Sequence, residues 1–353
     1  RVLRGVIPRE VRRALNMLVP FVIDAESLIP DPAWTPSVVR SCHQDLLDLW
    51  QRMGLVVHAG QSFENSSLRQ AVEKLPQKLR MLWQAQLERS PPVPCGNGWG
   101  GAVAPSNVED ICAIASLALV DDVRAEADFD KDEDQDEISI SPGGDDRLII
   151  SRLIAVNNAS VIRKALDISQ KNIQSKESHQ DIWDTRFRSL ASASSPTFKN
   201  VSIVDRYLME RHFRAKNSVS ALERFLRLLD GDAGGPRRVT IYSAWTDHFI
   251  DEKFKPDDVK EGIDAVLYGL ENRNVERVKV HMVKNQAFGK YAHDRYVRFG
   301  RFVWELGRGL EIFEGPGVAH LCQASFKSDA QSHLRVEQAL EREAERPPII
   351  VRR

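Results

Sequence analysis

Apolar residues in the first half of the chain occur in two patterns, short continuous runs and runs at helical spacing. A continuous run within 18–31 predicts a buried strand, and a second short run predicts another at 55–60. Residues 37–54 and 66–89 carry apolar side chains at helical spacing, and Pro76 predicts a kink in the second helix. Strands that alternate with helices are typical of a parallel α/β sheet.

The pattern then continues with a helix expected at 106–122 and a strongly acidic stretch at 121–137. That stretch holds ten acidic residues and two basic ones, so we expect a solvated loop. Residues 138–169 predict a short strand, a Gly-Gly turn and at least one helix. We therefore expect residues 1–187 to form one α/β domain that includes the acidic loop.

A second α/β domain is expected at 201–353, after a Ser- and Ala-rich linker at 188–200. Its predicted elements are strands at 201–210, 237–245 and 276–284, helices at 218–231 and 259–273, and a two-strand hairpin at 293–307 that turns near Gly300. The chain is thus expected to belong to the α/β class, with two domains.

The amino-acid composition says more about the cellular compartment than about the function. The 353 residues carry a net charge of -1, so any binding to nucleic acid must come from a local patch. The four cysteines lie far apart, which argues against a zinc ribbon or a disulfide framework and suits a reducing compartment. No apolar run is long enough for a transmembrane segment. We therefore expect a cytoplasmic protein.

Polar residues in the second half follow or precede predicted strands. Ligands of open α/β sheets bind beyond the carboxyl ends of the strands, so these residues are candidates to cradle a phosphate. The candidates are Asp205, Arg206, Tyr207, His281, Lys284, His293, Asp294, Arg295 and Arg308. Arg295 would supply a bidentate fork, and His293 could act as nucleophile or general acid. Alternatively, Asp294 and Arg295 form an internal salt bridge with His293 hydrogen-bonded beside them.

Several of these residues lie in three segments, "VDRYL", "HDRYVRF" and "GRGLEIF". Together, the three segments resemble the phospholipase D-like C-terminal domain of MIT-domain-containing proteins and bacterial phospholipase D-like proteins. The resemblance covers about 198–316 and implies a phospholipase D-like fold. Catalytic members carry two His-x-Lys-x4-Asp motifs, whereas here Arg295 replaces the lysine, Gly300 replaces the aspartate and no second motif exists. A homodimer could pair two copies of His293 for metal-independent cleavage. The MIT-associated domains instead imply binding to phosphoinositide membranes.

Carboxylates in the first half suggest a metal site. Asp24 ends the first predicted strand, Glu109 and Asp110 open a predicted helix, and Asp145 and Asp146 follow a predicted strand. This arrangement weakly resembles PIN-like nucleases, which implies Mg²⁺ or Mn²⁺ held by these residues and a water activated against a phosphodiester. Alternatively, the same residues cap a turn and favour helix N-termini.

Two functions follow as hypotheses. The first is a nucleic-acid phosphodiesterase or nuclease effector acting on RNA or DNA, in a setting of bacterial defence, with Asp24, His293 and Arg295 as candidate catalytic residues. The second is a non-catalytic adaptor that binds phosphate or a phosphoinositide and contacts a partner protein. The first hypothesis depends on Asp24 or His293, whereas the second depends on Arg295.

Overall fold

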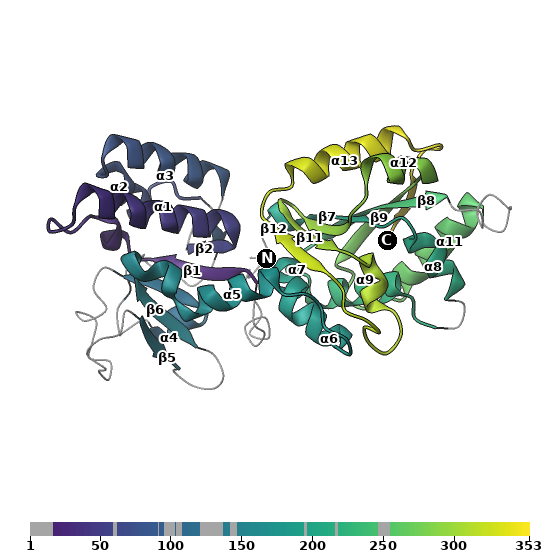
Figure 1. Ribbon diagram of the computed structural model, residues 1–353, viewed down its shortest axis with the longest axis horizontal. Helices are drawn as coiled ribbons and strands as arrows, with labels where there is room; N and C mark the ends of the chain where they lie inside the picture. Colours follow the sequence, from purple (N-terminus) through teal and green to yellow (C-terminus); the bar gives the residue numbers. More distant parts are fainter. Residues whose placement is uncertain are drawn as a thin grey trace. The chain divides into compact units, whose positions relative to one another are not determined.

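Two compact units make up the chain, Arg1–Ile168 (unit 1) and Ser169–Arg353 (unit 2). The computed structural model describes residues 17–58, 62–90, 92–94, 103, 108–120, 137–141, 147–193, 196–215, 218–245 and 255–353 (Figure 1). Each unit is an α/β unit with a sheet of its own. The predicted α/β class is therefore confirmed.

The division between the units lies before the predicted linker at 188–200. Residues of that segment form helix α7 (Arg188–Ser192) and a 3-10 turn, η6 (Pro196–Phe198), within unit 2. Leu190 and Phe198 are buried. The predicted linker does not separate the two units, because its small and apolar side chains pack into the core of unit 2.

The sheet of unit 1 has the strand order β3-β2-β1-β4-β6-β5. Its strands are β1 (Val19–Ile23), β2 (Gly54–His58), β3 (Val93–Pro94), β4 (Leu117–Val120), β5 (Glu137–Ile140) and β6 (Leu148–Arg152). All neighbours pair in parallel except β5, which runs antiparallel to β6. The chain builds the sheet outward from β1 in both directions, so the carboxyl end of β1 is the point where α/β sheets tend to bind ligands.

Helices cover both faces of this sheet. They are α1 (Pro36–Arg52), α2 (Ser67–Glu73), α3 (Gln77–Arg89), α4 (Val108–Cys112) and α5 (Ser160–Gln170), with 3-10 turns η2 (Ala25–Leu28) and η4 (Leu153–Asn158). α1, α2, α3 and α5 pack on one face, where Phe21 and Trp50 meet edge to face at 6.3 Å, and α4 packs on the other (Figure 1). Pro76 separates α2 from α3, so the expected kink is a break.

The helix predicted at 106–122 is mostly wrong. Only α4 is helical there, and Leu117–Val120 form the strand β4 between β1 and β6. All four residues of β4 are buried. A short apolar run that is buried on both faces has no periodicity to distinguish a strand from a helix, and only the neighbouring strands decide.

The sheet of unit 2 has the strand order β12-β11-β10-β7-β8-β9-β13. Its strands are β7 (Asn200–Val204), β8 (Arg237–Trp245), β9 (Val275–Lys284), β10 (Arg295–Phe299), β11 (Phe302–Leu306), β12 (Ala324–Lys327) and β13 (Ile349–Arg352). β7, β8 and β9 are parallel, whereas the remaining pairs are antiparallel. The predicted hairpin is confirmed, and its turn residue Gly300 has φ +58°, which glycine adopts readily.

The helices of unit 2 divide between the two faces of the sheet. They are α6 (His179–Ile182), α7, α8 (Leu208–Arg214), α9 (Ala221–Asp232), α11 (Pro256–Tyr268), α12 (Asn285–Tyr291) and α13 (Gln331–Arg342), with a π-helical turn, η5 (Trp183–Phe187), and a 3-10 turn, η7 (Gly309–Phe313). α12 and α13 cover the face that carries Tyr242 and Tyr296. Phe187, Phe225 and Phe313 cluster with Trp304 on the opposite face.

Polar rather than purely apolar contacts attach α13 to its face of the sheet. His333, Glu337 and Glu341 lie four residues apart and so form one stripe along the helix. Glu337 meets Arg298 of β10 in a bidentate ion pair, with nitrogen to oxygen distances of 2.7 and 2.6 Å. His333 contacts Glu305 of β11 at 3.0 Å. The stripe therefore docks α13 across several strands in one defined register.

None of the helices in the described ranges has the length and apolarity to cross a membrane.

Candidate functional site

Strand ends of unit 2 converge where the sequence predicted a phosphate site. β10 runs antiparallel to β7, and Tyr296 pairs with Val204, so the start of β10 lies beside the end of β7. Trp245 pairs with Lys284 at the ends of β8 and β9. The predicted convergence of the segments at Asp205, Lys284 and Arg295 on one edge of the sheet is therefore confirmed.

Asp205 is enclosed at this edge and is 1% exposed. One carboxylate oxygen accepts a hydrogen bond from the backbone N–H of Tyr207 at 3.1 Å, and the other accepts from the N–H of Leu310 at 3.0 Å. Burial raises the pKa of Asp205, and the nearby charge of Arg295 opposes this effect. Asp205 was predicted to contact phosphate, but it is buried behind the surface and instead fixes the backbone on both sides of the edge.

Gly309 brings the loop after β11 onto this carboxylate. Its φ is +59°, and a Cβ at this position would overlap Oδ2 of Asp205 and come within 2.9 Å of Cδ of Arg295. Only glycine leaves the space for Leu310 to donate its N–H to Asp205. The Gly-Arg-Gly-Leu segment therefore holds Asp205 and packs against Arg295.

Three arginines surround the ring of Tyr207. The guanidinium carbons of Arg206, Arg295 and Arg211 lie 5.2, 5.4 and 5.9 Å from the ring centroid. Each distance falls within the range of a cation–π contact. Tyr207 thus acts as a common platform that gathers positive charge at the end of β7.

Acidic neighbours neutralise one of these three arginines. Arg211 pairs with Glu311 at 2.6 Å and lies 3.9 Å from Glu314. Glu311 also pairs with Arg308, which was predicted to bind phosphate. Because both guanidinium groups already have carboxylate partners, Arg211 and Arg308 are poorly placed to receive an anion.

The other two arginines have no carboxylate partner among the described residues. Arg206 donates its Nε–H to the side-chain oxygen of Asn285 at 2.6 Å, and this neutral amide does not compensate its charge. Arg295 is half-buried and forms no hydrogen bond or ion pair with any described residue. Asn285, the first residue of α12, was missed by the sequence analysis, although its position directly after the strand ending at Lys284 was a usable signal.

His293 and Asp294 are exposed and contact no described residue through a hydrogen bond or an ion pair. The alternative in which Asp294 and Arg295 form a salt bridge is therefore wrong within the described part of the chain. Lys284 is exposed as well. A histidine nucleophile or general acid is normally oriented by a second group, and His293 has none among the described residues.

His281 does not lie at the edge, which corrects its predicted place in the site. It is three residues before the end of β9, is 1% exposed, and stacks on Tyr242 with ring centroids 4.9 Å apart. Side chains alternate between the faces of a strand, and this one faces α13, where Nε2 lies 3.6 Å from Glu341. Burial lowers the pKa of His281 to about 4.

Asp24 lies at the carboxyl end of β1, the switch point of the sheet in unit 1. Its carboxylate accepts hydrogen bonds from the backbone N–H groups of Glu26 and Val103, both at 3.0 Å, so it caps the turn η2. Glu109 and Asp110 are exposed in the first turn of α4. Asp145 and Asp146, like nearly all of the acidic stretch 121–137, lie outside the described residues.

A metal centre is not assembled in the described part of unit 1. No three His, Cys, Asp or Glu side chains among the described residues are grouped as metal ligands. The capping role proposed as an alternative for Asp24 is the one that the geometry shows. Mg²⁺ or Mn²⁺ binding at Asp24 stays a prediction.

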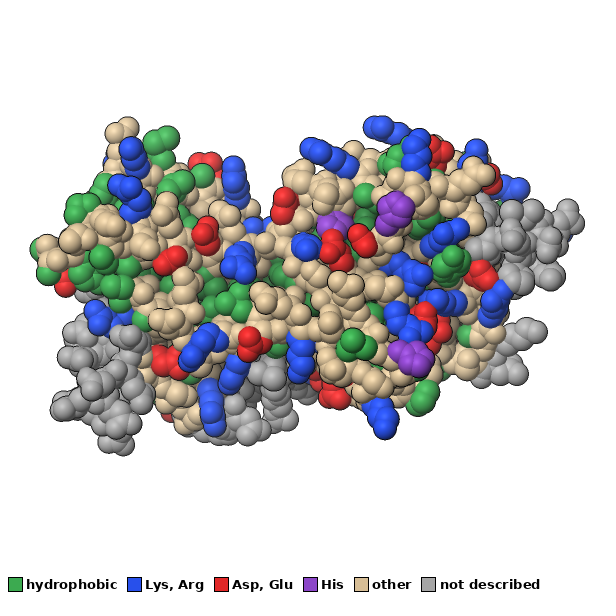
Figure 2. All heavy atoms as spheres, in the orientation of Figure 1, with side chains coloured by type: hydrophobic (Ala, Val, Ile, Leu, Met, Phe, Trp, Pro, Cys, Tyr) green, Lys and Arg blue, Asp and Glu red, His purple; other side chains and the backbone are tan. Residues whose placement is uncertain are grey.

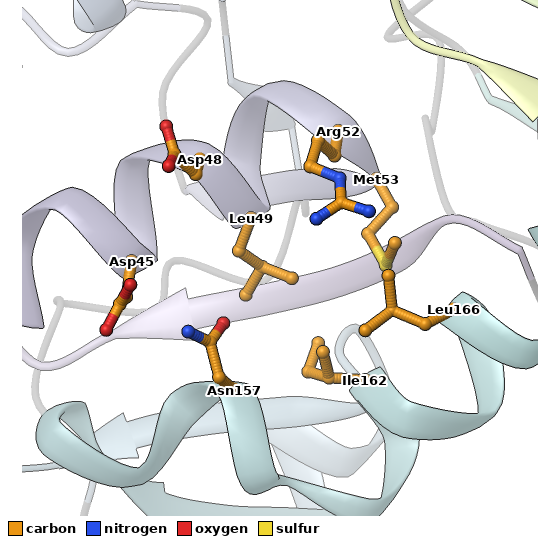
Figure 3. A pocket seen from close by; sticks show the side chains of 8 residues that line it. All are labelled: Asp45, Asp48, Leu49, Arg52, Met53, Asn157, Ile162 and Leu166. Atoms are coloured by element: carbon orange, nitrogen blue, oxygen red, sulfur yellow. The ribbon is translucent and has the colours of Figure 1, made fainter.

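A small pocket of unit 1 lies away from these carboxylates (Figure 3). It has a volume of about 130 Å³ and is lined by Asp45, Asp48, Leu49, Arg52, Met53, Asn157, Ile162 and Leu166. Pockets for ligands of drug size usually measure about 300–1,000 Å³. The pocket is therefore too small to hold a nucleotide, and Asp24 does not line it.

On the face of unit 2 that Figure 2 shows, Lys and Arg side chains are interspersed with Asp and Glu. Residues 169–353 contain 31 Lys and Arg and 26 Asp and Glu, so unit 2 has a net charge of +5, whereas the whole chain has a net charge of -1. An anion would be recognised best where a positive side chain has no acidic partner among the described residues.

No protein-family model matches the chain, and no curated protein matches it in sequence. The resemblances to phospholipase D-like and PIN-like proteins therefore stay predictions. The geometry of the edge formed by β7, β8, β9 and β10 is the basis for assigning a function to this chain.

Proposed function

We propose that unit 2 binds a phosphate group between Arg206 and Arg295, on the platform formed by Tyr207, and that this site holds its ligand without cleaving it. One observation carries the proposal: two guanidinium groups share one aromatic ring and have no carboxylate partner among the described residues. Arginine forks match the geometry of phosphate oxygens, and such charge-assisted bonds are the strong ones.

Fixed neighbours support this proposal, because they limit the freedom that the arginines lose on binding. Asn285 orients Arg206 through Nε, and the close approach of Gly309 confines Cδ of Arg295. Asp205 in turn holds the Gly309 loop in place. A site whose side chains are held in advance binds more tightly than one that must order them.

The absence of an orienting group for His293 among the described residues favours binding over chemistry. A nucleophilic histidine gains its reactivity from a neighbour that fixes its tautomer and stabilises its charge. Asp294 follows it directly in the sequence and is exposed, and it forms no hydrogen bond or ion pair with the imidazole. The adaptor hypothesis is therefore better supported than the nuclease hypothesis.

Titration of the full chain with inorganic phosphate, followed calorimetrically, tests the proposal. Arg295→Ala and Arg206→Ala are each expected to weaken binding by about tenfold to a hundredfold, because each removes hydrogen bonds to a charged group. Arg227→Ala is the matched control, since Arg227 is an exposed arginine of α9 that pairs with Glu223. Equal affinity of wild type and Arg295→Ala would refute the proposal.

Cleavage assays with labelled single-stranded RNA and DNA provide the second test. We expect no cutting by the wild type, either with Mn²⁺ or with EDTA. Cutting that needs Mn²⁺ and is lost in Asp24→Asn would place a nuclease in unit 1. Cutting that survives EDTA and is lost in His293→Ala would show that the edge of unit 2 is catalytic.

A further inference from the structure

The two unpaired arginines offer more hydrogen-bond donors than a phosphodiester can use. A guanidinium group carries five N–H donors. Arg295 donates none of them to a described residue, and Arg206 donates only Nε–H, to Asn285. Within the described ranges, all five donors of Arg295 and four donors of Arg206 are therefore without a protein acceptor.

The donors of both arginines gather around one aromatic ring. Both guanidinium carbons lie within 5.4 Å of the centroid of the Tyr207 ring, so their separation cannot exceed the sum of the two distances. Neither side chain forms an ion pair with a carboxylate in the part of the chain that the structure describes. Two forks that approach one anion from different directions can contact three of its oxygens, whereas a single fork contacts two.

Charge at the edge agrees with a ligand of more than one negative charge. The carboxylate of Asp205 offsets part of the charge of Arg295, and Glu311 and Glu314 offset Arg211. Arg206 has no carboxylate partner among the described residues, and exposed Lys284 precedes Asn285 on the same edge, whereas exposed Asp294 precedes Arg295. The positive groups Arg206, Arg295 and Lys284 thus outnumber the exposed carboxylate of Asp294.

On the basis of the proposed function, we infer that the ligand is a phosphomonoester rather than a phosphodiester. A monoester has three terminal oxygens and a charge of about −1.5 to −2 at pH 7, because its second pKa is about 6. A diester has two terminal oxygens and a single charge, so it would leave one fork partly unused. Phosphorylated ends of nucleic acids and phosphorylated lipid headgroups share this monoester chemistry.

Methyl phosphate and dimethyl phosphate distinguish the two classes without any other contact. The full chain is titrated with each compound at pH 7.5. Methyl phosphate is expected to bind at least about tenfold more tightly, which corresponds to one additional charge-assisted contact. Arg206→Ala and Arg295→Ala are each expected to abolish this preference, and Arg227→Ala is expected to keep it.

The pH dependence of the preference gives an independent readout. At pH 5 methyl phosphate carries a single charge, as dimethyl phosphate does, so the ratio of their affinities is expected to fall toward one. Taking the ratio at each pH removes effects of groups that titrate in the protein. A ratio that stays high at pH 5 would contradict the charge argument.

The outcomes separate this inference from the proposed function. Equal affinity for the two compounds at pH 7.5 would overturn the monoester inference and leave phosphate binding intact. Binding of neither compound would overturn the proposed function itself. A 5′-phosphorylated oligonucleotide compared with its 5′-hydroxyl form, and vesicles with phosphatidylinositol phosphate compared with phosphatidylinositol, then identify the source. Equal binding within both pairs would also refute the inference.

Discussion

His281 allows a prediction about stability that can be worked out from its surroundings. The side chain is buried between β9 and α13, and neither ring nitrogen has a hydrogen-bond partner among the described residues. It faces Lys279 and Glu341, and it stacks on Tyr242. Desolvation is the main reason that its pKa falls from 6.5 to about 4. The imidazole is therefore neutral in the folded protein at neutral pH.

A depressed pKa makes the folded state lose stability as the pH falls. Between pH 6.5 and pH 4 the unfolded chain binds a proton at His281 that the folded chain does not bind. Each pKa unit corresponds to about 1.4 kcal/mol, so the complete effect is about 3 kcal/mol and the part present at pH 5 is about 2 kcal/mol. The loss is absent above about pH 7.

His281→Phe removes this proton-binding group and keeps a flat ring for the stack on Tyr242. Hydrogen exchange of peptides from β8 and β9, measured by mass spectrometry in the full chain, gives the opening free energy of unit 2. From pH 7.5 to pH 5, the stability of the variant relative to wild type is expected to rise by about 2 kcal/mol. His320→Phe, which replaces an exposed histidine of the same unit, serves as control. Parallel pH profiles for wild type and His281→Phe would refute the reasoning.

Three further predictions concern the packing of unit 2 and the proposed site. Arg298→Met leaves the buried carboxylate of Glu337 without its cation, although Ser202 still donates a hydrogen bond to it, and is expected to lower the free energy of unfolding in urea by about 3–5 kcal/mol. Arg298→Met with Glu337→Leu is expected to recover most of this loss. Gly309→Ala is expected to lower the free energy of unfolding by at least about 2 kcal/mol and to weaken phosphate binding, because its Cβ would overlap Asp205. Gly315 also has a positive φ but faces open space, so Gly315→Ala is expected to lower the free energy of unfolding by only about 1–2 kcal/mol. EDTA is expected to leave phosphate binding unchanged, and loss of binding that Mg²⁺ restores would contradict this.

The edge of unit 2 could be predicted from sequence because strand ends are local features. Apolar runs ended at Asp205 and Lys284, and the order of strands and helices implied that the parallel strand ends meet. The ion pairs and hydrogen bonds of these residues could not be predicted in the same way. The partners of Arg211 and Arg308 come from the loop after β11, and the donors to Asp205 include a backbone N–H more than a hundred residues away.

The prediction for His281 was wrong because the face of the strand to which its side chain points was not known. The sequence predicts a strand that ends at Lys284, and His281 was placed in the site because it lies near that end. One strand residue advances about 3.3 Å, so His281 lies about 10 Å before the end, and its side chain points to the face that α13 covers. α13 itself was not predicted, so nothing in the sequence analysis could have shown that this face is buried.

The contacts show that the residues of the predicted motifs have different structural roles. In Asp205-Arg206-Tyr207, adjacent residues have separate tasks: the aspartate is buried and binds backbone, the arginine is open to the edge, and the tyrosine supports both Arg206 and Arg295. The Gly-Arg-Gly-Leu segment serves Asp205 through Gly309. Asp205, Tyr207 and Gly309 thus build the support for the two arginines to which we assign phosphate binding. The motifs therefore predict the architecture of the edge better than they predict its chemistry.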